Sequence, residues 1–344
     1  MFHKQGDGMK IKLVDIDSKI PNYALMKVSS HHKTRGDVIG FNIENPDLVY
    51  IACVFTKNRK KALAVAADYK NRGIEVKIGG TGINLTEVLP PAVERCSPDY
   101  DLYTMDQLYS RVKRICTTGA RKKKIDWILN AGMGFLNRGC IRNCGFCAVP
   151  KKEGMLRPVG CIDDLINPRS KNIILFDNNL TADPKVMHKL TEIKRRDLRV
   201  DITQGIDIRL VDDDMAKLLS EVKLKDYTIH YAWDLMVNSE SVLSGIAKLL
   251  KYMNSWHHMC FVLVGYNTTF EEDMYRAKTL IGMKIAPLIM RYQDPEMYVT
   301  KKKSEKTFDE IRRDHLARWV NGRFYKVCEF EKYDRWINAQ RAFA

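Results

Sequence analysis

Residues 139–150 read GCIRNCGFCAVP and contain three cysteines, Cys140, Cys144 and Cys147, with three and then two residues between them. Soft thiolates at such short intervals are typical ligands of zinc or of an iron-sulfur cluster. A closed zinc site needs four ligands, and no histidine stands at a fitting interval nearby. The motif therefore favours three irons of a four-iron cluster, in which the fourth iron stays open for a substrate or cofactor.

With Phe146 directly before its last cysteine, the motif resembles the cluster loop of the radical S-adenosylmethionine (radical SAM) superfamily. The resemblance implies a [4Fe-4S] cluster on Cys140, Cys144 and Cys147, with Phe146 among the residues that contact the cofactors. In that family the open iron binds the amino and carboxylate groups of S-adenosyl-L-methionine (SAM). One electron, from a donor such as flavodoxin or ferredoxin, then cleaves SAM to a 5′-deoxyadenosyl radical.

The composition fits a globular protein that attracts polyanions. The chain has 344 residues, with 57 Lys and Arg against 42 Asp and Glu, a formal charge of +15. This favours nucleic acid, DNA or RNA, as a partner. No apolar run approaches the roughly 20 residues of a membrane span, and residues 1–12 lack the centre of a signal peptide. Nine cysteines, an odd number, suit a reducing compartment, so we expect a cytoplasmic protein without a membrane partner.

The first part of the chain alternates strands and helices. Strand patterns lie at 10–15, 38–41, 48–53 and 74–78, and helical patterns follow the first and third of them. This order predicts a Rossmann-like parallel sheet within a domain of residues 1–118. The domain resembles the cobalamin-binding-like domain that precedes many radical SAM cores.

The sequence contains only part of the motifs for the two activities known in that branch, cobalamin binding and sulfur insertion. The Asp-x-His-x-x-Gly cobalamin signature is missing, because residues 15–20 contain no histidine. Cobalamin is therefore a doubtful cofactor here, although some members bind it without that ligand. Methylthiotransferases place a cysteine after each of the first strands of the domain to hold a second cluster. Only Cys53 matches this pattern, so sulfur insertion is disfavoured.

The second part of the chain predicts a barrel. Six strand patterns, separated by helices, lie at 134–136, 172–176, 200–203, 227–233, 260–264 and 285–290. Repeats of this kind build a partial (β/α)6 TIM-type barrel over residues 119–300, with chemistry at the carboxyl ends of the strands. Residues 301–344 read as a basic helix over 301–321 and an aromatic tail. This extension either caps the barrel or stacks on nucleic-acid bases.

Polar residues follow the second and third barrel strands. The resemblance implies that Asp177, Asn178 and Asn179 hold the amino group of SAM, where many members use Gly-Gly-Glu. The strand alternation of residues 204–209 predicts two polar faces. Arg209 then either binds the carboxylate of SAM or pairs with Asp207. The cofactor-binding candidates of this segment are Gln204, Asp207 and Arg209.

The later strand ends complete the candidate site. Gly265, Tyr266 and Asn267 resemble the adenine-contact turn that follows the fifth strand in the family. His230 and Asp234 lie at the fourth strand and are the catalytic candidates.

The sequence as a whole predicts a radical SAM enzyme of the branch with a cobalamin-domain-like N-terminus. We expect hydrogen abstraction followed by carbon-centred rearrangement, isomerisation or another modification of a base in DNA or RNA, or of its nucleotide precursor. The alternative is a radical SAM methylase or isomerase that acts on a small metabolite or peptide. A non-catalytic electron carrier would need a fourth cluster ligand, which no cysteine is placed to supply. The candidate substrate contacts are Lys151, Lys152, Lys301, Lys302 and Lys303.

Overall fold

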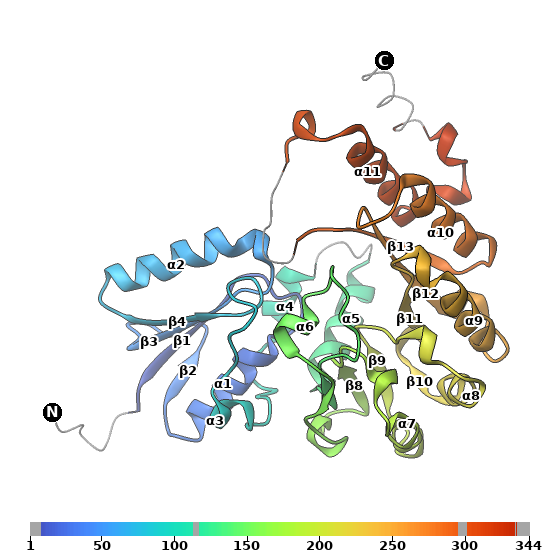
Figure 1. Cartoon of the computed structure of the whole chain (residues 1–344). Helices are drawn as coiled ribbons and strands as arrows, with labels where there is room; N and C mark the ends of the chain where they lie inside the picture. The colour runs from blue at the N-terminus through green and yellow to red at the C-terminus, as the bar shows by residue number, and fades with distance from the viewer. Residues whose placement is uncertain (1–7, 113–116, 295–300, 334, 336–344) are drawn as a thin grey trace. The chain divides into compact units, whose positions relative to one another are not determined.

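The computed structural model describes residues 8–112, 117–294, 301–333 and 335. The chain is mixed α/β, with 45% helix and 17% strand. It divides into two compact units (Figure 1). The first runs to Gly134 and includes Lys151–Glu153 and Asp163–Ile173, and the second contains the rest. The predicted domain limits at residues 118 and 300 stay predictions, because this division follows packing alone.

The first unit is built on a parallel sheet with the order β2-β1-β3-β4. This order opens the flavodoxin-like arrangement of doubly wound sheets. The predicted parallel sheet is thus confirmed. Its elements are β1 (Lys10–Asp15), α1 (Tyr23–Lys33), β2 (Val38–Gly40), β3 (Leu48–Ala52), α2 (Arg59–Asn71) and β4 (Glu75–Gly79), followed by α3 (Pro91–Glu94), α4 (Met105–Arg111), α5 (Thr118–Asn130) and β5 (Gly132–Gly134).

Helices cover both faces of this sheet: α2 lies on one side and α1 on the other (Figure 1). The buried face of α2 consists of Ala62 and Ala66, which pack against Val49 and Ile51 of the central strand β3. Small side chains let the helix approach the sheet closely, while the large residues of β3 fill the space between them. An Ala-rich helix that follows a strand of β-branched residues therefore indicates close packing of the helix on the sheet.

The second unit contains most of the remaining strands. In it β9 and β10 are parallel, and a separate sheet has the parallel order β11-β12-β13. The elements from residue 137 on are β6 (Asn137–Arg138), α6 (Val149–Glu153), β7 (Arg157–Pro158), β8 (Asn172–Leu175), α7 (Val186–Arg195), β9 (Arg199–Ile202), α8 (Asp213–Glu221), β10 (Lys223–Leu224), β11 (Ile229–Ala232), α9 (Ser239–Leu250), β12 (His258–Val264), α10 (Phe270–Gly282), β13 (Ala286–Arg291) and α11 (Phe308–Asn321). The α/β class is confirmed, and the six-repeat barrel stays a prediction.

Two predicted elements differ from the structure. The strand expected at 134–136 is wrong, because β5 ends at Gly134. The backbone N–H groups of Leu136 and Asn137 donate to the carboxylate of Asp177 and not to a neighbouring strand. The helix expected from residue 301 begins at Phe308, where Thr307 and Glu310 form a capping box.

The edge strand β13 is held by a side chain of α11. Asn321 accepts a hydrogen bond from the backbone N–H of Ile289 at 2.8 Å and donates one to its carbonyl at 3.0 Å. One amide side chain thus satisfies both backbone groups of a residue at the edge of the sheet. This pairing fixes α11 against β13.

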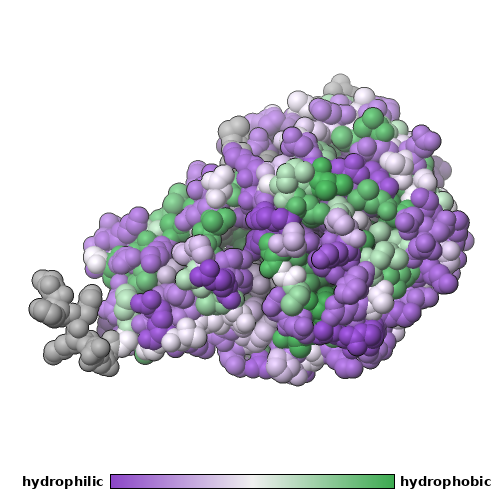
Figure 2. Space-filling view, turned by 60° about the horizontal axis from the view of Figure 1, so that its bottom comes forward, coloured by the Kyte–Doolittle hydropathy of each residue, from purple (hydrophilic) through white to green (hydrophobic). Residues whose placement is uncertain are grey.

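On the face drawn in Figure 2, hydrophilic residues surround smaller hydrophobic patches. Within the described residues, the structure has no helix of the length and apolar character needed to cross a membrane.

Candidate metal centre

The three motif cysteines lie in a tight loop of the second unit. Gly139 precedes the loop with φ +85°, and a Cβ at this position would lie 2.3 Å from the carbonyl oxygen of Met155. Only glycine fits this combination of backbone angle and close approach. Cys140 donates its backbone N–H to Gly154 O at 3.2 Å, and Cys147 donates to Cys144 O at 3.0 Å. The loop is therefore held by its own backbone.

Three N–H groups point at the cysteine sulfurs. Arg142 N lies 3.3 Å from Cys140 Sγ, and Val149 N lies 3.4 Å from Cys147 Sγ. The side-chain amide of Asn179 donates to Cys140 Sγ at 3.3 Å. Hydrogen bonds of this kind stabilise negative charge on sulfur and tune the potential of iron-sulfur clusters. The donors suit thiolates better than neutral thiols.

The three motif cysteines do not converge on a site for a single metal ion. Cys140, Cys144 and Cys147 are all free and partly exposed. Where the chain is described, no group of three or more His, Cys, Asp or Glu side chains could hold one metal ion. Each cysteine of a four-iron cluster binds a different iron, so its ligands need not converge on one point.

The cysteine thiols of the loop would ionise readily only if a positive charge were bound next to them. Burial raises the pKa of Cys144 and of Cys147 above the ordinary thiol value, and the neighbouring sulfurs add to the shift. Three thiolates together would repel one another. A bound cation reverses this balance, because a coordinating thiol is deprotonated outright. Without such a cation the cysteines are poor nucleophiles.

The residues that follow β8 support the loop. Asp177 is 0% exposed, and its carboxylate accepts hydrogen bonds from Leu136 N, Asn137 N and Asn137 Nδ2 at 2.7, 2.9 and 3.0 Å. Asn178 accepts from Gly139 N at 3.1 Å. Burial raises the pKa of Asp177, while these donors oppose the shift. Asp177 and Asn178 therefore position the loop, and their predicted contact with the amino group of SAM stays a prediction.

After β9, two arginines share one carboxylate. Asp207 accepts from Arg209 Nε at 2.6 Å and from Arg142 Nε at 3.1 Å. Burial alone would raise the pKa of Asp207, but the bonds and charges of Arg209 and Arg142 keep it below the usual value. The pairing of Arg209 with Asp207 is thus present. The predicted strand alternation is wrong here, because β9 ends at Ile202 and residues 208–210 form a 3-10 turn.

Asp234 follows β11 and lies within electrostatic reach of Cys144 and Cys147. Burial raises the pKa of Asp234 to about 6, against the opposing charges of Arg276 and Arg209. A carboxyl group with this pKa changes its charge close to neutral pH. Asp234 is therefore the catalytic candidate that the structure brings to the cysteine loop.

A buried arginine holds the backbone at this point. Arg276 and Asp273 of α10 are both 0% exposed and pair at 2.6 Å. Arg276 also donates to Trp233 O and Asp234 O, at 2.7 and 2.6 Å, and to Leu263 O at 2.8 Å. The guanidinium thus ties the carboxyl ends of β11 and β12 together. Sequence reasoning missed it.

Asp234 provides a pH-dependent prediction for the cluster-free protein. Its folded-state pKa of about 6 exceeds the ordinary 3.8, so the fold favours the neutral form. This contribution is complete below about pH 4 and is lost as the pH rises through 6. Asp234→Asn avoids the loss. We expect its advantage in unfolding free energy to grow between pH 4 and 6, reaching roughly 2 to 3 kcal/mol above that range.

Urea unfolding at a series of pH values measures this difference. The exposed Asp226 offers a control, because Asp226→Asn removes a carboxylate from the same unit without removing a buried group. An advantage of Asp234→Asn that is equal at pH 5 and pH 8 would contradict the assignment.

Aromatic residues after β12 and β13 pack on the loop. The rings of Tyr266 and Phe146 lie 5.4 Å apart in an edge-to-face arrangement, and Tyr292 lies 4.8 Å from Tyr266. A Cβ on Gly145 would lie 2.4 Å from the hydroxyl oxygen of Tyr266. The turn predicted to contact adenine is thus next to the cysteines. Sequence reasoning missed Tyr292 and Arg142, although Arg142 lies inside the motif itself.

Other candidates are less closely associated with the loop. Gln204, Gly265 and Asn267 are exposed. The ring of His230 stacks on Phe261 at 5.7 Å. Burial lowers the pKa of His230, and its charged neighbours are Asp201, Lys225 and Asp226, none of which belongs to the loop.

The lysine candidates occupy varied environments. Lys301 pairs with Glu310 at 2.6 Å, and the backbone N–H of Lys302 donates to Glu305. Lys151 is exposed and Lys152 is partly buried. Lys303 begins a short 3-10 helix. Their role as substrate contacts stays a prediction.

Neither a protein-family model nor a curated protein gave a significant match to this chain.

Proposed function

We propose that this chain is a radical SAM enzyme. The observation that carries the proposal is the surrounding of the three-cysteine loop: Asn179, Asp234 and Tyr266, from the ends of three different strands, all approach it. A three-thiolate loop with N–H donors to sulfur and titratable groups at strand ends suits a cluster with one open iron. When bound and reduced, a [4Fe-4S] cluster would supply the electron that cleaves SAM.

The chain's own residues would then bind and orient the cofactor. Cys140, Cys144 and Cys147 would hold the cluster, with Asn179 donating to one sulfur. Arg209, fixed by Asp207, keeps further N–H donors for the carboxylate of SAM. Asp234 is ionised above its pKa of about 6, and its carboxylate would pair with an ammonium group. Tyr266 and Phe146 would limit the access of water to the loop.

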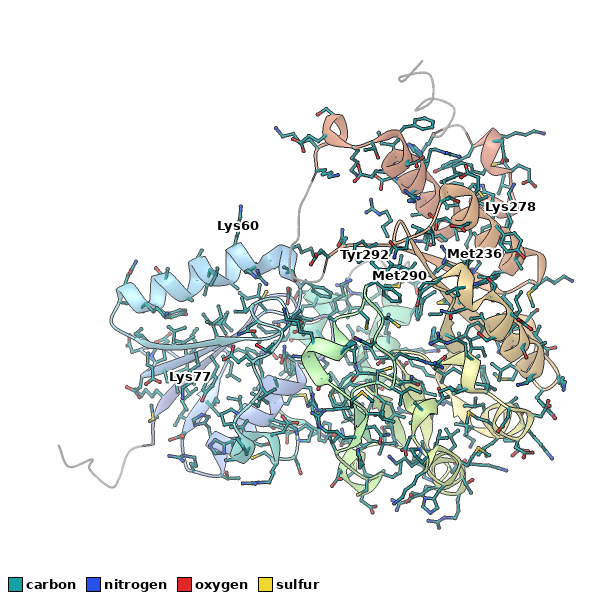
Figure 3. The ribbon with its side chains drawn as sticks, viewed as in Figure 1. Lys60, Lys77, Met236, Lys278, Met290 and Tyr292 are labelled. Carbon is teal, nitrogen blue, oxygen red and sulfur yellow. The ribbon has the colours of Figure 1, made fainter. Side chains whose placement is uncertain are left out.

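We extend the proposal to the substrate, a base in DNA or RNA or its nucleotide precursor, modified after hydrogen abstraction. The formal charge of +15 supports this choice. Exposed lysines also contribute to this charge. One of them, Lys60, points from α2 away from the sheet (Figure 3). The free thiols of the described residues suit a reducing, cytoplasmic setting with flavodoxin or ferredoxin as electron donor.

SAM cleavage tests the proposal. Anaerobically reconstituted protein, reduced with dithionite, should convert SAM to 5′-deoxyadenosine, measured by liquid chromatography and mass spectrometry. Addition of the correct nucleic acid or nucleotide should increase the yield and produce a nucleoside of altered structure. Protein without the cluster is the matched control. The proposal fails if fully loaded, reduced protein releases only S-adenosylhomocysteine, or no product with any of these substrates.

A further inference from the structure

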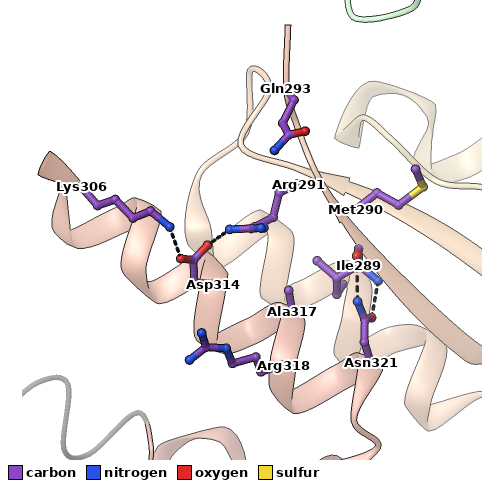
Figure 4. Close-up of a pocket in the computed structure, with 9 residues that line it drawn as sticks. All are labelled: Ile289, Met290, Arg291, Gln293, Lys306, Asp314, Ala317, Arg318 and Asn321. Carbon is purple, nitrogen blue, oxygen red and sulfur yellow. Dashed lines mark hydrogen bonds and ion pairs between the residues drawn. The ribbon is translucent and has the colours of Figure 1, made fainter. Parts of the chain in front are cut away.

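A cavity of about 580 Å³ lies between the edge strand β13 and helix α11 of the second unit (Figure 4). Its polar lining consists of Arg291, Gln293, Lys306, Asp314, Arg318 and Asn321. The volume is in the range of pockets that bind small ligands. No residue of the cysteine loop lines the cavity, so the cavity is separate from the candidate metal centre.

The lining is positively charged. Asp314 is the single carboxylate among the lining residues and faces the three cations Arg291, Lys306 and Arg318, which leaves an excess of two positive charges. Asp314 accepts from Arg291 and from Lys306, the latter at 2.5 Å (Figure 4). This carboxylate orients both cations, and each of them keeps further N–H donors.

Arg318 is the cation whose guanidinium N–H donors have no described partner. It lies one helical turn after Asp314, and its guanidinium has no hydrogen bond or ion pair with any described residue. A guanidinium offers five N–H donors in a planar fork that matches the oxygens of a phosphate. Beside two oriented cations, such a group is suited to a dianionic phosphate.

The walls of the cavity are fixed. Asn321 joins α11 to β13 through its two hydrogen bonds with Ile289. A site on packed elements loses less conformational freedom on binding than one on a free loop. Asp314 orients Arg291 and Lys306 on this frame, and Arg318 lies exposed beside them on α11.

A series of aromatic contacts connects the end of β13 with the cysteine loop. β13 ends at Arg291, and the next residue, Tyr292, has its ring 4.8 Å from that of Tyr266. Tyr266 in turn packs on Phe146 of the loop at 5.4 Å.

We propose that this cavity binds a phosphate group of the substrate nucleotide. The inference rests on the proposed function and adds the residues that recognise the substrate, with Arg318 as the principal phosphate ligand. The same phosphate chemistry could come from a free nucleotide or from one position in a nucleic-acid strand.

Calorimetry on the full-length protein tests the site. The probes are inorganic phosphate, the four deoxynucleoside 5′-monophosphates, the corresponding unphosphorylated nucleosides and a short single strand of DNA. We expect the monophosphates to bind more tightly than the nucleosides. Arg318→Glu should weaken monophosphate binding by about tenfold or more, because it replaces a charged donor by a repelling carboxylate. Arg318→Gln should give a smaller loss in the same direction.

Lys326→Glu is the matched control, because Lys326 is exposed, lies after the same helix and does not line the cavity. It changes the net charge equally and should alter monophosphate affinity less than about twofold. Circular dichroism checks that each variant is folded. Equal losses in the Arg318→Glu and Lys326→Glu variants, or nucleosides that bind as tightly as monophosphates, would overturn the phosphate site.

Two further comparisons distinguish a nucleic-acid strand from a free nucleotide as the source of the phosphate, and the phosphate site from the proposed reaction. Tight binding of the strand with weak binding of monophosphates, both sensitive to Arg318→Glu, identifies the polymer as the source of the phosphate. Wild-type protein that binds monophosphates through Arg318 and yet does not cleave SAM overturns the proposed reaction and leaves the site intact. Protein that cleaves SAM but binds neither probe overturns the site alone.

Discussion

Replacement of Cys140, Cys144 or Cys147 by alanine should abolish both the iron-sulfur cluster and the cleavage of SAM. Each thiolate would hold a different iron, and a loop with two remaining thiolates cannot retain a cluster that already has one open iron. Burial and mutual repulsion of the thiols add to this effect, because they favour the neutral, non-ligating form. Iron and sulfide analysis after anaerobic reconstitution should fall from about four of each per chain to near zero.

Cys161→Ala is the matched control, because Cys161 is an exposed cysteine outside the motif in the same unit. It should keep the wild-type iron content, visible absorbance and yield of 5′-deoxyadenosine. Wild-type iron content in protein that lacks all three motif cysteines would refute the cluster assignment.

Asp273→Asn should destabilise the second unit strongly. Asp273 pairs with two arginines, Arg276 at 2.6 Å and Arg313 at 2.7 Å, and neither Asp273 nor Arg276 is exposed. Removing one partner of a buried ion pair leaves an uncompensated charge, at a cost of about 3 to 5 kcal/mol. Since domains are stable by about 5 to 15 kcal/mol, the variant should unfold at much lower urea concentration or fail to accumulate as folded protein.

An exposed ion pair provides the comparison. Asp213 pairs with Lys251 at 2.7 Å on the surface of the same unit, so Asp213→Asn should change the urea midpoint little. The role of the buried network would be refuted if Asp273→Asn and Asp213→Asn had the same midpoint. SAM affinity measured on any folded Asp273→Asn protein then reports whether Arg276 positions Asp234.

Local spacing predicted the elements of the fold well. The helical pattern expected after the strand at 48–53 is α2 at Arg59–Asn71, and the strand expected at 260–264 lies within β12 at His258–Val264. These elements follow from hydrophobic periodicity and from nearby caps, which are encoded within a few residues. The cysteine loop is equally local, because glycine and the ligand spacing occur in one segment.

Predictions that depended on distant partners were less successful. The strand expected at 134–136 stops early because its backbone donors bind Asp177, about forty residues later in the chain. Asp177 positions the cysteine loop through these bonds, a role that the sequence did not indicate, and its predicted contact with SAM stays a prediction. The contacts of Arg276 with three backbone carbonyls have no sequence signature, since any surface arginine of a helix has the same local pattern.

The side-chain clamp on β13 also has a consequence for solubility. The outer edge of a sheet presents backbone groups that can pair with a strand of a second molecule, which is a route to aggregation. Asn321 occupies both backbone groups of Ile289. An incoming strand would first have to displace this amide and the helix that carries it. During folding, β13 is therefore vulnerable to intermolecular association until α11 has docked, and the order of these two events would decide the yield of monomeric protein.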